Sequence, residues 1–251
     1  MLNHIKTRRL NLSEIFFISL KMFRKYFKFI LPICLAAYFP LYFIVHMITP
    51  SLDISLLLDP QYVMDSQIII YFLVFMAANV MFLSLISAAM TGLVKAESDG
   101  RPISFALLLD VSLLKWGKLV FTGLLNLIIV SLSSALIVPA VFFGVSFYFY
   151  ASVIAISDKW GFKALTMSSN IIKGRWFGAF GFIIFLNVTS TLLTFSISML
   201  IAPLFSMFFG SSNIIINVLT GVTCETLCSF MLIASGIWFV NQYYQNSAVA
   251  K

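Results

Sequence analysis

The chain has 251 residues, of which 61% are hydrophobic and 10% are charged, and its mean hydropathy is +1.03. Roughly a quarter of the residues of soluble globular proteins are charged, so this composition excludes a soluble domain and predicts that most of the chain lies in lipid. The formal net charge of +7 does not indicate nucleic-acid binding, because the cations alternate with apolar segments and form no separate basic domain.

The N-terminal segment differs from a cleaved signal peptide. Four cations interrupt its apolar stretch, and no small-x-small cleavage site follows it, so we expect it to be retained. Cys34, Cys224 and Cys228 all fall within segments that we expect to span the membrane. They lack the further ligands that zinc requires, and we interpret them as small buried residues.

Six apolar segments are long enough to cross a membrane. A hydrocarbon core about 30 Å thick requires about 20 apolar residues per helix. The predicted spans are 29–49, 67–94, 118–137, 139–157, 177–208 and 213–241. The third and fourth divide at Val138-Pro139, because proline is favoured in the first turn of a new helix. The outer connections are then residues 50–67, the Val138-Pro139 turn and residues 210–212.

A shorter amphipathic segment precedes each pair of spans, at 11–28, 103–117 and 162–176. In the first, Lys21, Arg24, Lys25 and Lys28 share one helical face, and Leu12, Phe16, Leu20, Phe23 and Phe27 occupy the other. Such a division is typical of a helix in the membrane surface, where each cation near an anionic leaflet contributes about 1 kcal/mol.

These amphipathic segments also align with one another. Lys25-Tyr26, Lys115-Trp116 and Arg175-Trp176 each place a cation and an interfacial aromatic residue before a span, at offsets of 90 and 60 residues. The sequence therefore predicts an all-α integral membrane protein built as three parallel repeats of interfacial helix plus helical hairpin. The predicted headgroup contacts are Lys21, Arg24, Lys25, Lys28, Lys115, Trp116, Arg175 and Trp176.

The distribution of charge gives an orientation. All 16 Lys and Arg residues fall on one side of the membrane when the six spans are threaded in order. The positive-inside rule then predicts that both termini are cytoplasmic and that anionic headgroups on that side are the partners.

Glu225 is the sharpest polar candidate, because it lies near the middle of the sixth span. A carboxylate at that depth costs about 2.5 to 3.5 kcal/mol, so it should face protein or water. Asn217, Gly221, Glu225 and Ser229 share one helical stripe, which directs Glu225 into a helix contact. It is either a proton or substrate site or a partner in an interhelical hydrogen bond, for instance with Asn79, Asn126 or Asn187.

No residue pattern predicts a catalytic, cofactor or metal site. His46 is interpreted as a polar residue near the outer end of the first span, since His4 lies on the opposite side of the membrane. Asp53 and Asp59 of the outer loop suggest a divalent cation as an alternative to a solvated loop.

The segment from Val138-Pro139 through Asp158-Lys159, Gly161, Ser168-Ser169 and Arg175-Trp176 resembles the YciC family of bacterial inner-membrane proteins. Residues 92–110 and 13–31 are similar to the linker and the opening helix of that family. The resemblance implies the inner membrane of a Gram-negative bacterium and brings no catalytic role to any residue.

Three functions remain open. The leading hypothesis is a noncatalytic inner-membrane protein whose amphipathic helices engage lipids or partner proteins. The second is a small permease or lipid translocator that uses Glu225 and the intramembrane Asn residues, which a water-accessible groove ending at Glu225 would favour. The third is a membrane-embedded lipid enzyme, which needs acids or His converging at one interface. Glu97, Asp110 and Asp158 share the cytoplasmic side but stand among Lys and Arg, so we interpret them as solvated.

Overall fold

The computed structural model describes residues 3–48, 66–157, 159–209 and 214–249, and in those ranges the chain forms eleven α-helices and no strand. The helices are α1 (Asn3–Thr7), α2 (Leu12–Ile48), α3 (Ser66–Ser98), α4 (Phe105–Ser112), α5 (Trp116–Ser133), α6 (Ile137–Phe147), α7 (Tyr150–Ile156), α8 (Phe162–Ile172), α9 (Trp176–Phe209), α10 (Ile214–Cys228) and α11 (Phe230–Val249). The predicted outer-loop acids Asp53, Asp59 and Asp65 lie outside the described residues, as do residues 210–212.

Within the described residues, six helical stretches are long and apolar enough to cross a membrane, which confirms the predicted all-α membrane fold class. They are Leu12–Met47, Leu73–Ser98, Trp116–Ser133, Ile137–Ile156, Trp176–Phe208 and Ile214–Asn246. Helices suit lipid because their backbone groups bond internally, whereas an exposed strand edge would leave N–H and C=O groups without partners.

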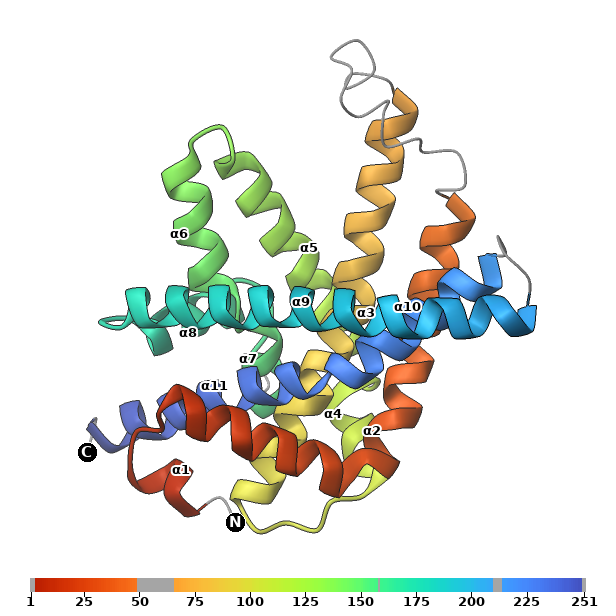
Figure 1. The fold of residues 1–251 in the computed structure, drawn as a ribbon. Coiled ribbons are helices and arrows are strands. Elements are labelled where there is room, and N and C mark those ends of the chain that lie inside the picture. The colour runs from red at the N-terminus through yellow and green to blue at the C-terminus, as the bar shows by residue number, and fades with distance from the viewer. Residues whose placement is uncertain (1–2, 49–65, 158, 210–213, 250–251) are drawn as a thin grey trace.

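The long helices form three hairpins, α2/α3, α5/α6 and α9/α10, which splay apart from a shared centre (Figure 1). The first two hairpins rise towards the top of the view, whereas α9 runs across it and the α9/α10 hairpin points to the right. Only Ala179, Phe182 and Leu186 of the described side chains of α9 are buried, and the others are exposed or half-buried.

Helix α2 joins two segments that the sequence predicts as separate elements, 11–28 and 29–49. The structure has one helix over Leu12–Ile48, with Pro32 and Pro40 inside it. In Figure 1 its first part lies across the lower edge of the molecule and its second part turns upward. Proline removes one backbone hydrogen bond and crowds the preceding turn, so it bends the helix without ending it.

Two other predicted spans are interrupted. The chain leaves the helix at Tyr148 and Phe149, between α6 and α7, and again at Ser229, between α10 and α11. The predicted turn at Val138-Pro139 is also displaced, because α5 ends at Ser133 and α6 begins at Ile137. Pro139 therefore sits in the first turn of α6, where the backbone N–H that proline lacks would have no intrahelical partner.

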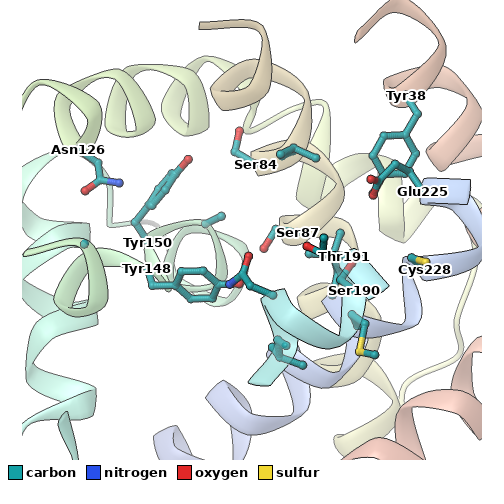
Figure 2. Close-up of a pocket in the computed structure, with 17 residues that line it drawn as sticks. Tyr38, Ser84, Ser87, Asn126, Tyr148, Tyr150, Ser190, Thr191, Glu225 and Cys228 are labelled. Carbon is teal, nitrogen blue, oxygen red and sulfur yellow. The ribbon is translucent and has the colours of Figure 1, made fainter. Parts of the chain in front are cut away.

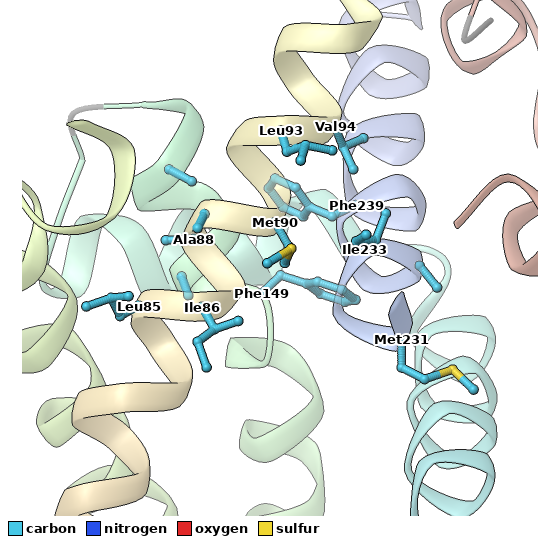
Figure 3. Packing of buried hydrophobic residues seen from close by; sticks show 14 of the residues in the cluster. Leu85, Ile86, Ala88, Met90, Leu93, Val94, Phe149, Met231, Ile233 and Phe239 are labelled. Carbon is cyan, nitrogen blue, oxygen red and sulfur yellow. The ribbon is translucent and has the colours of Figure 1, made fainter. Parts of the chain in front are cut away.

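The core lies where α3, α11 and the α6/α7 break meet (Figure 3). Phe149 is buried and stacks on Trp238 and Phe239, with ring centroids 4.9 Å and 5.6 Å apart. Close packing is possible because Gly236 of α11 lies against the backbone of Thr91 in α3. A Cβ atom added at Gly236 would lie 3.2 Å from the Thr91 Cα atom.

We expect Gly236→Ala to destabilise the protein, because overpacking a close helix contact costs about 1 to 3 kcal/mol. The matched control is Gly181→Ala in α9, where no heavy atom outside the helix lies within 4 Å of an added Cβ. Both variants gain the better helix propensity of alanine, about 0.5 to 1 kcal/mol. The measurement is the melting temperature in detergent, and equal values for the two variants would contradict the predicted contact.

Candidate intramembrane site

A cavity of about 470 Å³ lies where the three hairpins converge. Residues from α2, α3, α5, α6, α7, α9, α10 and α11 line it, so each of the six candidate spans contributes to its wall. Its polar lining residues are Tyr38, Ser84, Ser87, Asn126, Tyr148, Tyr150, Asn187, Ser190, Thr191 and Glu225 (Figure 2). Lipid offers no hydrogen-bond partners, so a concentration of polar groups among apolar helices is suited to water or a polar ligand.

Glu225 reaches this cavity from α10 and also touches α2. The Tyr42 hydroxyl donates a hydrogen bond to Glu225 Oε1 over 3.4 Å, and Figure 2 shows Glu225 beside Tyr38. Gly221, one turn earlier, permits this approach, because a Cβ atom there would overlap the Tyr42 ring. Glu225 thus contacts another helix, as the sequence predicts. Its partner is Tyr42 and not one of the three asparagines considered.

Two of those asparagines share the cavity with Glu225. Asn126 lies at the opposite end in Figure 2, and its buried Oδ1 atom accepts no hydrogen bond from any described residue. Asn187 also lines the cavity, while its Nδ2 atom donates to the Ile183 carbonyl at 2.8 Å. Asn79 lies outside the cavity lining and donates to the Phe75 carbonyl at 2.7 Å. An amide can satisfy itself on its own helix in this way, so position within a span does not decide its partner.

The tyrosines and hydroxyl residues of the cavity are absent from the sequence-based set of candidates. Tyr38, Tyr148 and Tyr150 occupy α2, the α6/α7 break and α7, where sequence alone suggests ordinary interfacial or packing residues. A polar residue in an apolar span is a visible signal. Which of the many such residues face one cavity depends on the tertiary arrangement.

The basic face of α2 is exposed, as an interfacial helix requires. Lys21, Arg24, Lys25 and Lys28 are all exposed, while Ile15, Ser19 and Met22 are buried against the protein. Of the predicted apolar face, Phe16 and Phe23 pack on Phe230 of α11, with ring centroids 5.5 Å and 6.2 Å apart. Leu12, Leu20 and Phe27 remain exposed and are the side chains of this face left for lipid.

The other predicted headgroup contacts turn towards the protein. Lys115 Nζ donates to the Ile154 carbonyl at 3.0 Å, and Arg175 donates to Gln242 Oε1 at 3.2 Å. Trp116 and Trp176 donate to backbone carbonyls of α3 and α6, those of Met81 at 3.0 Å and Phe142 at 3.5 Å. Cations and indoles at the start of a helix can therefore bind protein acceptors as well as lipid headgroups. In this structure the four residues donate hydrogen bonds to the protein.

A charged cluster at the end of α3 holds α1, α2 and α11 in place, and it includes Glu97, which was expected to be solvated. Asp99 accepts hydrogen bonds from Lys6 at 2.8 Å and from the Tyr244 hydroxyl at 2.6 Å, and Lys95 lies 3.3 Å from its second oxygen. Glu97 accepts from Lys25 at 2.9 Å and also from the Tyr26 hydroxyl. These two acids therefore link α1, α2 and α11 to the end of α3.

The remaining candidates from the sequence are the three cysteines, His46 and the outer-loop acids. Cys34, Cys224 and Cys228 are free and buried, and His46 stacks beside Tyr42 with ring centroids 6.2 Å apart. Within the described ranges, no group of three or more His, Cys, Asp or Glu residues is placed to hold a metal ion. The predicted alternative of a divalent cation at Asp53 and Asp59 falls outside those ranges.

Comparison with known proteins brings no further assignment. No family model, no curated protein and no solved structure matches this chain.

We expect the Asp99 cluster to make stability depend on pH. Burial raises the pKa of Asp99, but hydrogen bonds from Lys6 and Tyr244 and the charge of Lys95 outweigh it and lower that pKa to about 2. A depressed pKa in the folded state stabilises the protein above the unfolded value of about 3.9, and this stabilisation is lost as the pH falls towards 2.

Asp99→Asn should therefore lower the melting temperature at pH 6, and the gap from the parent protein should narrow between pH 4 and pH 2. Asp110→Asn is the control, because Asp110 is exposed on α4. A gap for Asp99→Asn that stays constant down to pH 2 would rule out the ionic role of Asp99.

Proposed function

We propose that this multi-pass membrane protein is a noncatalytic permease or translocator whose central cavity binds a polar group within the membrane. The observation that supports this proposal is the cavity, which brings together Glu225, Asn126 and Asn187 from three different spans. A groove ending at Glu225 is the feature that favours transport over simple packing. Intramembrane ionisable groups that face a cavity usually mark a substrate or ion path.

The packing alternative explains less of this arrangement. An interhelical hydrogen bond accounts for Tyr42 and Glu225, at 3.4 Å, but needs no cavity and no collection of hydroxyl groups around it. The lipid-enzyme alternative rests on Glu97, Asp110 and Asp158. It is less well supported, because Glu97 is bonded to Lys25 and Tyr26, Asp110 is exposed on α4, and Asp158 lies outside the described residues. A general acid or base requires a group free to exchange a proton with substrate.

The basic face of α2 supports a second part of the proposal, contact with anionic lipid headgroups. Lys21 and Arg24 are exposed and make no ion pair with any described residue, and exposed apolar side chains flank them. This pattern suits a helix at the membrane surface. We also propose, from the sequence resemblance, that the protein is a member of the YciC family and resides in a bacterial inner membrane.

Equivalent contacts support the proposed repeats. Trp116 opens α5 and donates to a carbonyl 35 residues earlier, and Trp176 opens α9 and donates to one 34 residues earlier. Each indole thus binds a helix of the preceding unit. Tyr26, which has no preceding unit, donates to Glu97.

We expect water to reach the cavity. In a background with Cys34, Cys224 and Cys228 replaced by alanine, Ser190→Cys should react with a membrane-impermeant, water-soluble thiol reagent, because Ser190 lines the cavity. Leu192→Cys is the matched control two residues along α9, where the side chain is exposed but lies outside the cavity lining. A thiol in lipid ionises poorly and should react slowly. Equal labelling of both positions, or of neither, would argue against an aqueous cavity.

We expect both termini to be cytoplasmic. A fluorescent protein fused after Lys251 should fluoresce, whereas alkaline phosphatase at the same place should be inactive. Alkaline phosphatase inserted after Asp59, in the predicted outer loop, should be active. Reversing the orientation would put all 16 cations outside, against the strongest determinant of insertion, so the opposite pattern of activities would refute the topology.

A further inference from the structure

The cavity carries a charge preference. Among the described residues that line it, Glu225 is the only Asp, Glu, Lys, Arg or His. No Lys or Arg belongs to the described lining, and Lys95, which follows Ser87 on α3, lies 3.3 Å from Asp99. An anionic ligand would therefore meet a carboxyl group and no compensating cation.

Several acceptor atoms in the cavity remain available to a ligand. The Ser84 hydroxyl donates to the Val80 carbonyl at 2.6 Å, and the Asn187 amide donates to Ile183 at 2.8 Å, so both present oxygen lone pairs. Asn126 Oδ1 is buried without a donor. Glu225 Oε2 accepts no hydrogen bond from the described residues, while Oε1 has only the long bond from Tyr42, at 3.4 Å. A ligand that donates hydrogen bonds complements this wall.

A divalent metal ion fits less well than an organic cation. Calcium takes six to eight oxygen ligands, commonly from several carboxylates, whereas this cavity offers one carboxyl group. Its volume of about 470 Å³ falls in the range of small-molecule sites, which run from about 300 to 1,000 Å³. Tyr38 stands beside Glu225 in Figure 2, and an aromatic face next to a carboxylate suits an ammonium group.

We propose that the cavity binds a primary organic ammonium ion, with its N–H groups donating to Glu225 and to the oxygen atoms along the wall. This inference rests on the proposed function and specifies its ligand class. Charge-assisted hydrogen bonds from an ammonium to a carboxylate are about twice as strong as neutral ones, so Glu225 provides most of the affinity. The ammonium group comes either from a free amine or from an ethanolamine lipid headgroup.

The test uses the full-length Ser190→Cys protein in detergent and measures protection of that thiol from the water-soluble reagent. The probes are n-butylammonium, butyrate and 1-butanol, which share a carbon chain and differ in charge. Dihexanoyl phosphatidylethanolamine and dihexanoyl phosphatidylcholine form the lipid arm, because only the first carries ammonium N–H groups.

We expect n-butylammonium to protect saturably, butyrate and butanol not to protect, and Glu225→Gln to weaken protection at least tenfold. Glu225→Asp, which keeps the charge, should retain most of it, and Asp110→Asn, which removes a surface charge, should retain all of it. Protection by the ethanolamine lipid as well as by butylammonium would identify a headgroup source, and protection by butylammonium alone a free amine.

The outcomes separate the two proposals. Absence of Ser190→Cys labelling before any probe is added rejects the aqueous cavity and therefore the proposed function. Normal labelling that butylammonium does not reduce, or that butyrate or butanol reduces equally, rejects the ammonium site alone. If Glu225→Gln fails to fold, the comparison among the three butyl probes on the Glu225 protein still decides the ligand class.

Discussion

The structure depends on the absence of hydrogen-bond partners in lipid. Every polar group in a spanning segment must be satisfied by protein or face a cavity. Several hydroxyl groups obey this rule locally: Ser84, Thr122 and Ser133 each donate to the carbonyl four residues earlier on their own helix, at 2.6 to 2.7 Å. A hydroxyl group that donates to its own helix gives little information about function. Asn126 Oδ1 and Glu225 Oε2 are not satisfied in this way and belong to residues that line the cavity, while the buried hydroxyls of Ser146, Thr220 and Thr226 also lack a partner among the described residues.

Two interruptions of the helices build the core and open the cavity at the same time. At the α6/α7 break, Phe149 turns into the core against Trp238, while the adjacent Tyr148 lines the cavity. At Ser229 the chain changes direction, so that α10 packs on α2 and α9 while α11 packs on α3 and α2. The breaks direct consecutive parts of one span towards different helices, and residues on both sides of each break line the cavity.

The ends of several helices are held together by charged groups and by the buried amide of Asn241. Asn241 of α11 donates to the Ile5 and Arg8 carbonyls at 2.7 and 2.8 Å and accepts from the Leu10 amide, which fixes the segment around α1. Asp99 and Glu97 then link α1 and the first part of α2 to the end of α3. The first part of α2 is thereby held with its cations outward, so its packing on α11 and its exposed basic face are consistent with each other.

The sequence by itself determined the class of the protein and the positions of its apolar segments, because hydrophobicity and length are properties of consecutive residues. It also identified Glu225, Asn126 and Asn187, since a polar residue in an apolar span is conspicuous without a fold. Only the tertiary structure decided that these three share a cavity, that Asn79 does not, and that Tyr42 pairs with Glu225. The helix breaks at Phe149 and Ser229, and the inward turn of Trp116 and Trp176, were likewise beyond the sequence. In each case the deciding partner comes from a segment distant in the chain, and periodicity along one helix carries no information about which helix lies opposite.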